Sequence, residues 1–278
     1  MNKFLTRLLL FVVAVPLLIL MVFLDWGSHF FINFFVIICS ILGSIEMGNL
    51  LTHNNFPINK RLTPFLGASI PLLAYFEVLG FITQEWMVFL LILFVAGIFT
   101  RQIFKSTPQD FTNILHKVSG NLLVFIYPGL FFYFITKISE LPLASEAYLV
   151  FLFMTFGNDT FAYIFGKLLG KYSSKPFVAS PNKSVIGFIG GFSFTLATAF
   201  IAQWLFPELL GPHPLQALLL GSAIGLTTIL GDLFESALKR SADSKDSGNL
   251  IPGRGGILDS VDSLLFSAPV FYFFIQLI

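Results

Sequence analysis

Residues 8–24, LLLFVVAVPLLILMVFL, form a run of 17 residues without a charged side chain. Several later stretches approach the roughly 20 apolar residues that a helix needs to cross a hydrocarbon core of about 30 Å. The chain of 278 residues is 56% apolar and only 11% charged. Soluble folds do not repeat such runs nine times, so the sequence predicts a polytopic integral membrane protein.

The membrane spans are expected to be helices, because backbone amides in lipid must find their partners within the segment. The residue alternation of an outer-membrane β-barrel is absent from these runs. The predicted fold class is therefore all-α, with about nine transmembrane helices. The predicted spans are 4–24, 30–51, 62–81, 86–104, 118–136, 147–166, 184–206, 215–237 and 262–278.

The basic residues predict the orientation of these helices. Fifteen of the sixteen Lys and Arg residues fall on alternate polar segments, and the exception is Lys137. Basic residues concentrate in cytoplasmic loops, so the N-terminus is expected in the cytoplasm and the C-terminus outside. The expected location is the bacterial inner membrane, with the active site on the cytoplasmic side.

The chain shows no internal repeat and no separate soluble segment. A single membrane domain over 1–278 is therefore expected, with N-terminal helices in 1–140 and a C-terminal half, 145–278, that carries the active site. Asn158, Asp159 and Asp232 all fall within apolar spans of that half. Charged groups within a membrane are costly and commonly mark function.

The stretch LKRSADSKDSGNLIPGRGGILDSVDS, residues 238–263, has the densest charge in the chain. Just before it, Asp232, Glu235, Ser236 and Lys239 follow the spacing i, i+3, i+4, i+7 and line one helix face. Asp259 and Asp262 repeat the i, i+3 spacing where the last span begins. The glycines of IPGRGG let backbone N–H groups approach an anion before a helix N-terminus.

Oxygen ligands of this kind suit Mg²⁺, which takes one or two carboxylates and leaves its other positions to water and phosphates. The predicted metal ligands are Asp232, Asp246, Asp259 and Asp262, and a second cation is left open. The four histidines are scattered, and Cys39 is the only cysteine, so no zinc site is expected. Glycines, cations and carboxylates together are the set needed to hold polyphosphate and metal.

A second polar cluster follows the sixth span, in GNDTFAYIFGKLLGKY (157–172) and SPNKSVIGFIGG (180–191). Ser180 and Lys183 supply donors just before a helix, with Lys183 placed to meet a phosphate. Both clusters belong to predicted cytoplasmic segments and are expected to face one site. A purely structural ion-pair network is the alternative for the aspartates, and Glu46 and Glu77 are open between pairing within the bundle and function.

At these residues the sequence resembles the CDP-diacylglycerol synthases, also called phosphatidate cytidylyltransferases. The family's C-terminal signature reads approximately S-x-x-K-R-x-x-x-x-K-D-x-x-x-x-x-P-x-H-G-G-x-x-D-R-x-D. The residues in register with it are Ser236, Lys239, Arg240, Lys245, Asp246, Pro252, Gly255, Gly256, Asp259 and Asp262. Gly231–Asp232, Asn158–Asp159 and SPNKS at 180–184 resemble further family motifs, so the resemblance covers about 145–278.

Three positions depart from the pattern. Arg254 stands where the family usually has His, Ser260 where it usually has Arg, and Ile186 where it usually has Glu. The hypothesis is that the positive charge has moved, with Arg254 making the phosphate contact otherwise made from position 260. A guanidinium remains charged and can bind phosphate through two parallel hydrogen bonds.

The resemblance implies that CTP and phosphatidate react to give CDP-diacylglycerol and pyrophosphate at the cytoplasmic face. The implied partners are CTP, phosphatidate and membrane lipids, with no nucleic acid, and a homodimer is left open. Catalytic roles are assigned to the four aspartates together with Lys239, Arg240 and Lys245. Substrate binding is assigned to Asn158, Asp159, Ser180, Lys183, Ser236, Arg254, Gly255 and Gly256.

Two alternatives use similar residues. Another CTP-dependent membrane lipid enzyme, such as an isoprenoid-lipid cytidylyltransferase or a polyprenol kinase, would need the same polyphosphate site with a different acceptor. A transporter that uses the intramembrane carboxylates as an ion path would explain Asp159 and Asp232 but not the register from Lys245 to Asp262.

Overall fold

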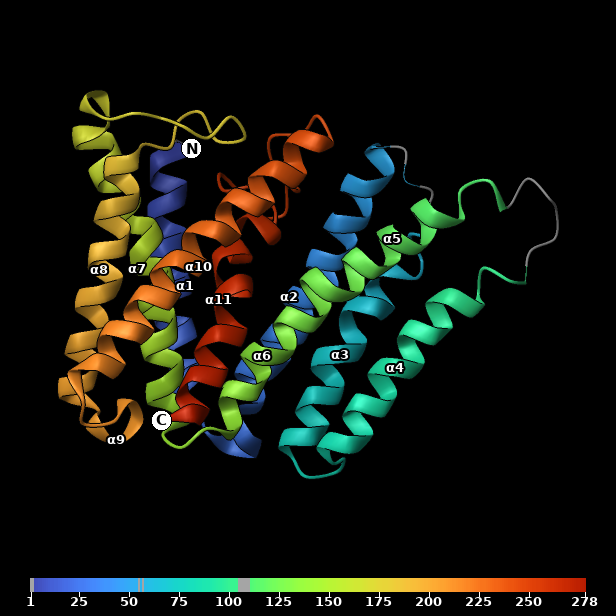
Figure 1. Cartoon of the computed structure of the whole chain (residues 1–278), viewed down its shortest axis with the longest axis horizontal. Helices are drawn as coiled ribbons and strands as arrows, with labels where there is room; N and C mark the ends of the chain where they lie inside the picture. The colour runs from blue at the N-terminus through green and yellow to red at the C-terminus, as the bar shows by residue number, and fades with distance from the viewer. Residues whose placement is uncertain (1–2, 55, 57, 105–110) are drawn as a thin grey trace. The chain divides into compact units, whose positions relative to one another are not determined.

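The protein was analysed as a computed structural model, which describes residues 3–278 except 55, 57 and 105–110, and side chains from residue 12 onward. The described part of the chain is helical and contains no strand beyond an isolated bridge between Ile251 and Gly255 (Figure 1). The predicted all-α fold is confirmed. Backbone amides of these apolar segments find their partners within each helix, as a lipid environment requires.

Six helical segments of the described chain are long and apolar enough to cross a membrane. Each coincides with one of the predicted spans, and the ends differ by a few residues because helices extend beyond the hydrocarbon core. The segments are α2 (Trp26–His53), the run Ile114–Glu140, the run Ala144–Tyr172, α8 (Val185–Leu205), α10 (Pro214–Ser241) and α11 (Leu258–Leu277). The run Ile114–Glu140 joins α5 (Ile114–Val124), η2 (Phe125–Leu130), α6 (Phe131–Lys137) and η3 (Ile138–Glu140).

The other three predicted spans coincide with α1 (Lys3–Phe23), α3 (Thr63–Val78) and α4 (Gln84–Thr100). The apolar stretches found among residues with described side chains are Val12–Phe23 of α1, a helix of 21 residues in all, and the shorter helices Thr63–Val78 and Gln84–Thr100. Six spans are thus supported by length and composition, and the count of nine stays a prediction. Two short pieces complete the helices: η4 (Gly170–Tyr172), which ends α7 (Ala144–Leu169), and α9 (Pro207–Leu210).

The chain divides into two compact units, and each unit is formed by two separate stretches of the sequence. The first unit comprises residues 1–137 and 241–259, and the second comprises 138–240 and 260–278. The charged stretch after α10 therefore belongs to the same unit as α2 and α3.

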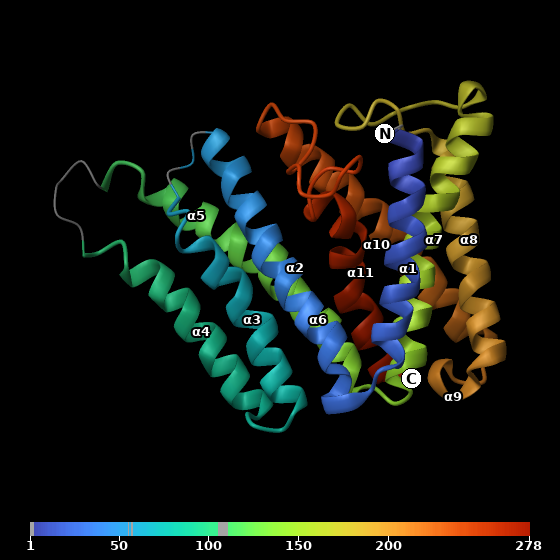
Figure 2. The same ribbon diagram turned by 180° about the vertical axis from the view of Figure 1, so that it is seen from behind.

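In the first unit, α2 packs against α3 at Gly67, where an added Cβ would lie 2.6 Å from the carbonyl oxygen of Ser40. The Ser40 hydroxyl lies 2.7 Å from the Gly67 carbonyl oxygen and 2.8 Å from that of Pro128. Pro128 lies within η2, the widened π-turn of the run Ile114–Glu140, and proline removes one helix hydrogen bond there. A buried hydroxyl thus supplies a donor where the helix is irregular. Figure 2 shows the backbones concerned, with α2 next to α3 and α6.

A buried ion pair explains the one lysine outside the alternating pattern of charge. Lys137 Nζ lies 3.0 Å from Glu77 Oε1, and both side chains are less than a tenth exposed. The Tyr133 hydroxyl also donates to Glu77 Oε2 at 3.1 Å. Lys137 is therefore a partner of Glu77 within the helices, and Glu77 has the structural role that the sequence left open.

In the second unit, glycines bring neighbouring helices into close contact. An added Cβ on Gly191 of α8 would lie 2.6 Å from the carbonyl oxygen of Asn158 in α7, and one on Gly187 would lie 2.8 Å from that of Ala162. On α10, a Cβ on Gly231 would lie 2.6 Å from the carbonyl oxygen of Asp262 in α11. Small residues permit this approach of helices in lipid, and here they bring the helices together at residues of the predicted site.

Candidate active site

In the first unit, the carboxylate of Asp259 holds the glycine loop that precedes α11. Its Oδ2 accepts hydrogen bonds from the backbone N–H groups of Ser247 at 2.8 Å and Gly256 at 2.7 Å. The Ser247 hydroxyl lies 3.0 Å from the same oxygen. Gly255 has φ +117°, a conformation that favours glycine, and an added Cβ there would collide with Asp259. Glycine at 255 therefore lets the loop turn back onto this carboxylate.

Glu46 of α2 is a second carboxylate on the same loop. It is 3% exposed and accepts hydrogen bonds from the N–H groups of Ile257 and Leu258, both at 2.9 Å. Those groups belong to the N-terminus of α11, which lacks partners within the helix and favours negative charge. The Ser247 hydroxyl lies 3.0 Å from Glu46 Oε2, so one serine bridges Glu46 and Asp259.

The glycines of the loop leave room for the Glu46 side chain. A Cβ added at Gly248 would lie 2.6 Å from Glu46 Oε1, and one at Gly256 would collide with the Glu46 carboxylate and the Ser247 hydroxyl. Sequence reasoning did not include Glu46 in the site. Its only signal was a carboxylate within an apolar span, and nothing in the sequence paired it with a loop 201 residues away.

The other charged groups of this loop are exposed. Lys245, Asp246 and Arg254 all have exposed side chains. The loop thus has an inner side, bound by Glu46 and Asp259, and an outer side that presents two cations and a carboxylate. That is the arrangement a polyanion would need for contact with the loop, although the role of each residue stays a prediction.

In the second unit, one face of α10 meets the loop between α7 and α8. Lys183 forms an ion pair with Asp232, and the Ser180 hydroxyl donates to the Ser236 hydroxyl at 2.9 Å. One turn further on, Arg240 Nε donates to the carbonyl oxygen of Ala179 at 3.3 Å. The α10 residues are four apart and so share one face, and their partners lie 49 to 61 residues earlier in the sequence.

Four carboxylates gather in the same unit. Asp159 of α7, together with Asp232 and Glu235 of α10, are the electrostatic neighbours of Asp262 in α11. Asp262 is 7% exposed, and its Oδ1 accepts a hydrogen bond from the Ser263 N–H at 2.7 Å. A buried carboxylate among carboxylates is unfavourable unless cations approach it.

Hydrogen bonds and ion pairs hold the members of this carboxylate group. Asp159 Oδ1 accepts a hydrogen bond from the Ser263 hydroxyl at 3.2 Å. Lys239 pairs with Glu235 four residues before it on α10. With the pair of Lys183 and Asp232, two ammonium groups therefore lie beside two of the four carboxylates. This set retains an excess of negative charge that suits a divalent cation.

Asn158 has a different environment from the other predicted substrate-binding residues. It is 1% exposed, and its Nδ2 donates to the Thr195 hydroxyl at 2.9 Å. The Thr195 hydroxyl in turn donates a hydrogen bond to the carbonyl oxygen of Met154 at 3.2 Å. In this conformation the Asn158 side chain joins α7 to α8.

The predicted site residues are distributed over both units. The first unit contains Lys245, Asp246, Arg254, Gly255, Gly256 and Asp259, and the second contains Asn158, Asp159, Ser180, Lys183, Asp232, Ser236, Lys239, Arg240 and Asp262. Asp259 and Asp262 lie one turn apart at the start of α11. Of the three departures from the family pattern, Ile186 donates its backbone N–H to the Ser173 hydroxyl at 3.0 Å, while Arg254 is exposed and Ser260 is half-buried.

The carboxylates of the described residues fit Mg²⁺ only if water or substrate completes its coordination. Within the described residues, no three His, Cys, Asp or Glu side chains are grouped closely enough to ligate one ion alone. Mg²⁺ usually takes only one or two carboxylates and completes its shell with water and substrate phosphate. The carboxylates of Asp262 and Asp232 can supply the one or two oxygen ligands of that mode, with Lys183 beside Asp232 as a competing cation.

The chain matches the model of the cytidylyltransferase family over residues 5–278. It is 36% identical over 194 residues to an uncharacterized protein, YnbB, of Escherichia coli, covering 68% of this chain and 63% of that protein. It is 42% identical over 156 residues to the phosphatidate cytidylyltransferase of Bacillus subtilis, covering 56% of this chain and 57% of that enzyme. For the phosphatidate cytidylyltransferase of Thermotoga maritima the identity is 36% over 205 residues, covering 72% and 74%.

The alignments to the first two relatives thus span less than two thirds of each relative's length. The family match extends over both units, including the N-terminal helices, where the sequence alone showed a resemblance only in hydropathy. Together with the loop bound by Asp259 and the contacts between α10 and the SPNK loop, these comparisons confirm the resemblance. The chain belongs to the cytidylyltransferase family.

Proposed function

We propose that this chain is a membrane phosphatidate cytidylyltransferase, which converts CTP and phosphatidate to CDP-diacylglycerol and pyrophosphate. The observation that supports this most strongly is the contact between α10 and the SPNK loop. Asp232 with Lys183 and Ser236 with Ser180 join two motifs of the family in one polar cluster. The names of the relatives from Bacillus subtilis and Thermotoga maritima support the same activity.

The reaction needs anions to be brought together more than it needs a strong base. A phosphate oxygen of phosphatidate is already ionised, and it would form a bond to the α-phosphorus of CTP. The bond from that phosphorus to the bridging oxygen would break, and pyrophosphate would leave with the electron pair. Positioning and electrostatic stabilisation dominate phosphoryl transfer of this kind.

Lys183, Lys239 and Arg240 are the cations we assign to the phosphates in the second unit. In the structure described, Lys183 and Lys239 pair with Asp232 and Glu235. These pairs keep both ammonium groups oriented before substrate arrives, so that a phosphate would exchange one anionic partner for another. In the first unit, Lys245 and Arg254 are exposed on the glycine loop and are assigned to phosphate contacts.

Asp232 and Asp262 would hold Mg²⁺ in the second unit, with Asp246 and Asp259 as the ligands assigned in the first. When bound, the metal would neutralise charge on the polyphosphate. The chain's own contribution is to keep these carboxylates in place: Ser263 N–H holds Asp262, and the N–H groups of Ser247 and Gly256 hold Asp259.

We also propose that all nine predicted spans cross one membrane domain, with the N-terminus and the site on the cytoplasmic side. The alternation of basic residues supports this orientation. The bacterial relatives support the inner membrane as its location. CTP would then reach the site from the cytosol, while the acyl chains of phosphatidate remain in the bilayer.

The activity can be tested with purified protein, radiolabelled CTP, Mg²⁺ and phosphatidate, with lipid-extractable label as the readout. We expect label in the lipid fraction and its loss when Mg²⁺ is chelated. Asp232→Asn should abolish most turnover, because it removes one negative charge from the carboxylate group and takes away the anionic partner of Lys183. Asp25→Asn, which changes an exposed aspartate outside the site, is the matched control.

The acceptor separates this proposal from its alternatives. Label that appears with an isoprenoid phosphate or a polyprenol, and not with phosphatidate, would assign the chain to another CTP-dependent lipid enzyme. Ion flux without CTP consumption would favour a transporter. Either result would contradict the proposed substrate while leaving family membership unchanged.

A further inference from the structure

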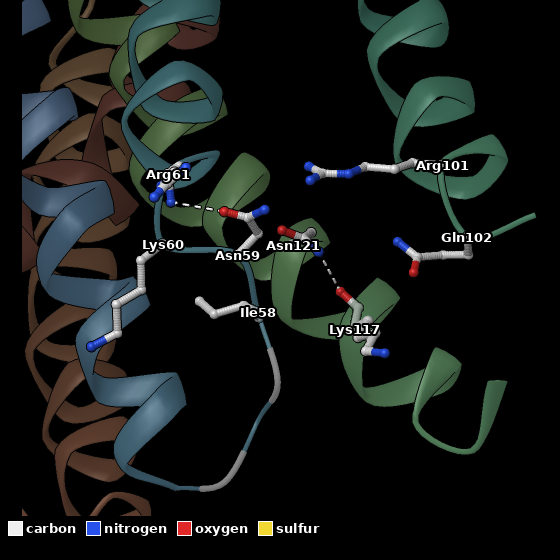
Figure 3. A pocket seen from close by; sticks show the side chains of 8 residues that line it. All are labelled: Ile58, Asn59, Lys60, Arg61, Arg101, Gln102, Lys117 and Asn121. Atoms are coloured by element: carbon white, nitrogen blue, oxygen red, sulfur yellow. Dashed lines mark hydrogen bonds between the residues drawn. The ribbon is translucent and has the colours of Figure 1, made fainter. Parts of the chain in front are cut away.

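The first unit contains a cavity that is lined by none of the residues assigned to catalysis or substrate binding. It has a volume of about 440 Å³ and is lined by Ile58, Asn59, Lys60, Arg61, Arg101, Gln102, Lys117 and Asn121. These residues come from the connection between α2 and α3, the C-terminal end of α4 and the first turns of α5. Figure 3 shows Arg101 and Gln102 on one side, with Arg61, Asn59 and Asn121 on the other.

The lining is cationic. It includes two lysines and two arginines and no acidic residue. Within the described part of the chain, no carboxylate forms an ion pair with Lys60, Arg61 or Arg101. Like charges gathered around one space repel each other, so an anion in that space would lower the electrostatic free energy. Two guanidinium groups are suited to phosphate, which they bind through paired hydrogen bonds.

Two buried amide side chains add a second requirement. Gln102 is 6% exposed and Asn121 is 4% exposed, and the side-chain oxygen of each is buried without a hydrogen-bond partner among the described residues. Their nitrogens are occupied: Asn121 Nδ2 donates to the Lys117 carbonyl oxygen at 2.6 Å, and Gln102 Nε2 donates to that of Ile98 at 3.4 Å. Buried acceptors are normally satisfied, so the missing partner must be a donor, such as a hydroxyl group.

The place of the cavity in the fold distinguishes a lipid from a soluble anion. The lining residues lie in the connection between α2 and α3, just after the last residue of α4 and on the first turns of α5. In a membrane protein, basic residues at the ends of apolar helices lie where the lipid headgroups are. Large apolar side chains next to them in sequence are exposed: Phe65 by 71%, Phe104 by 85% and Leu115 by 82%. Exposed apolar side chains within four residues of the polar lining suit a ligand with acyl chains attached to a polar headgroup.

From these observations we infer that the cavity binds the headgroup of an anionic phospholipid that carries hydroxyl groups on its phosphate ester. The phosphate contacts the arginines and lysines, and a headgroup hydroxyl donates to Gln102 or Asn121. The site is separate from the glycine loop, since no residue of 241–259 lines it. A lipid bound there would be retained by the protein regardless of turnover.

Binding can be measured on the full-length protein in a non-ionic detergent by native mass spectrometry or calorimetry, with dihexanoyl phosphatidylglycerol as the probe. Dihexanoyl phosphatidylmethanol has the same charge and no hydroxyl group, and we expect it to bind several-fold more weakly. Arg61→Gln with Arg101→Gln should weaken phosphatidylglycerol binding by about tenfold or more, because two charge-assisted contacts are lost. Lys171→Gln with Lys175→Gln removes the same charge from exposed positions outside the cavity and is the matched control.

The amide oxygens have their own test. Gln102→Met with Asn121→Leu should remove the preference for phosphatidylglycerol over phosphatidylmethanol while retaining the preference for both over zwitterionic dihexanoyl phosphatidylcholine. Equal binding by the arginine variant, the lysine control and the unaltered protein would overturn the inference. Glycerol 1-phosphate that binds as tightly as the lipid would assign the cavity to a soluble phosphate ester and contradict a lipid site. Transferase activity is measured on the same samples. A variant that loses lipid binding and keeps transferase activity would show that the cavity and the active site are independent.

Discussion

Replacing Glu46 with alanine should destabilise the glycine loop and the start of α11. The change leaves two backbone donors without their acceptor, the N–H groups of Ile257 and Leu258, both at 2.9 Å, and it removes one of the two carboxylates beside the Ser247 hydroxyl. A buried donor that loses its partner costs about 1–3 kcal/mol. Since Ser247 retains Asp259 as a partner, the cost comes from the two backbone donors, and we expect a loss of about 2–6 kcal/mol.

The single cysteine of the chain provides the assay. Cys39 is 3% exposed, so a thiol-reactive fluorophore should label it only as the protein unfolds. At about 2–4 °C per kcal/mol, the loss corresponds to a fall in melting temperature on the order of 10 °C. Glu46→Gln keeps one acceptor oxygen and should fall between Glu46→Ala and the unaltered protein.

Glu208 offers a matched control for this series, because it is an exposed glutamate at the start of α9. Glu208→Ala should leave the melting temperature within about 2 °C of the unaltered protein, since exposed substitutions cost little. If Glu46→Ala melted together with Glu208→Ala, the hydrogen bonds to Glu46 would contribute nothing to stability, and the reasoning from its burial would be wrong.

Asp262→Asn should abolish most turnover and leave the melting temperature unchanged or raised, because it removes charge from a buried group of carboxylates; near-normal turnover at limiting Mg²⁺ would exclude Asp262 as a ligand. Asp259→Asn should lower both turnover and melting temperature, since Asp259 accepts hydrogen bonds from Ser247 and Gly256. Arg254→Ala should lower kcat/KM at least tenfold, with partial rescue by Ser260→Arg, and a silent Arg254→Ala would refute the relocation of the positive charge. Single cysteines introduced in a Cys39→Ala background test the orientation. We expect labelling from the cytoplasm at four lysine positions and labelling from outside at Glu208. External labelling of a cysteine at position 245 would overturn the orientation. The cytoplasmic set is Lys60, Lys117, Lys175 and Lys245.

The sequence was sufficient for the helices and for the family. An apolar run long enough to cross a membrane satisfies its backbone within itself, so a helix over 30–51 or 215–237 depends on local residues alone. The family signature from Ser236 to Asp262 also depends on residue order alone, so it could be recognised without the structure. The resemblance also assigns Lys183 and Asp232 to one site, and in the structure their side chains form an ion pair.

Tertiary structure decided what each charged side chain contacts. Asp259 looked like a metal ligand from its spacing to Asp262, and the structure adds a role in which it binds the backbone of its own loop. Glu46 could not be assigned from the sequence, because the group that it binds lies more than 200 residues further along the chain. The cations around the cavity looked like ordinary cytoplasmic charges when each was considered in its own segment. Helix packing brings Arg61 and Arg101 to one space, and distances between side chains from different helices depend on that packing and not on their spacing in the sequence.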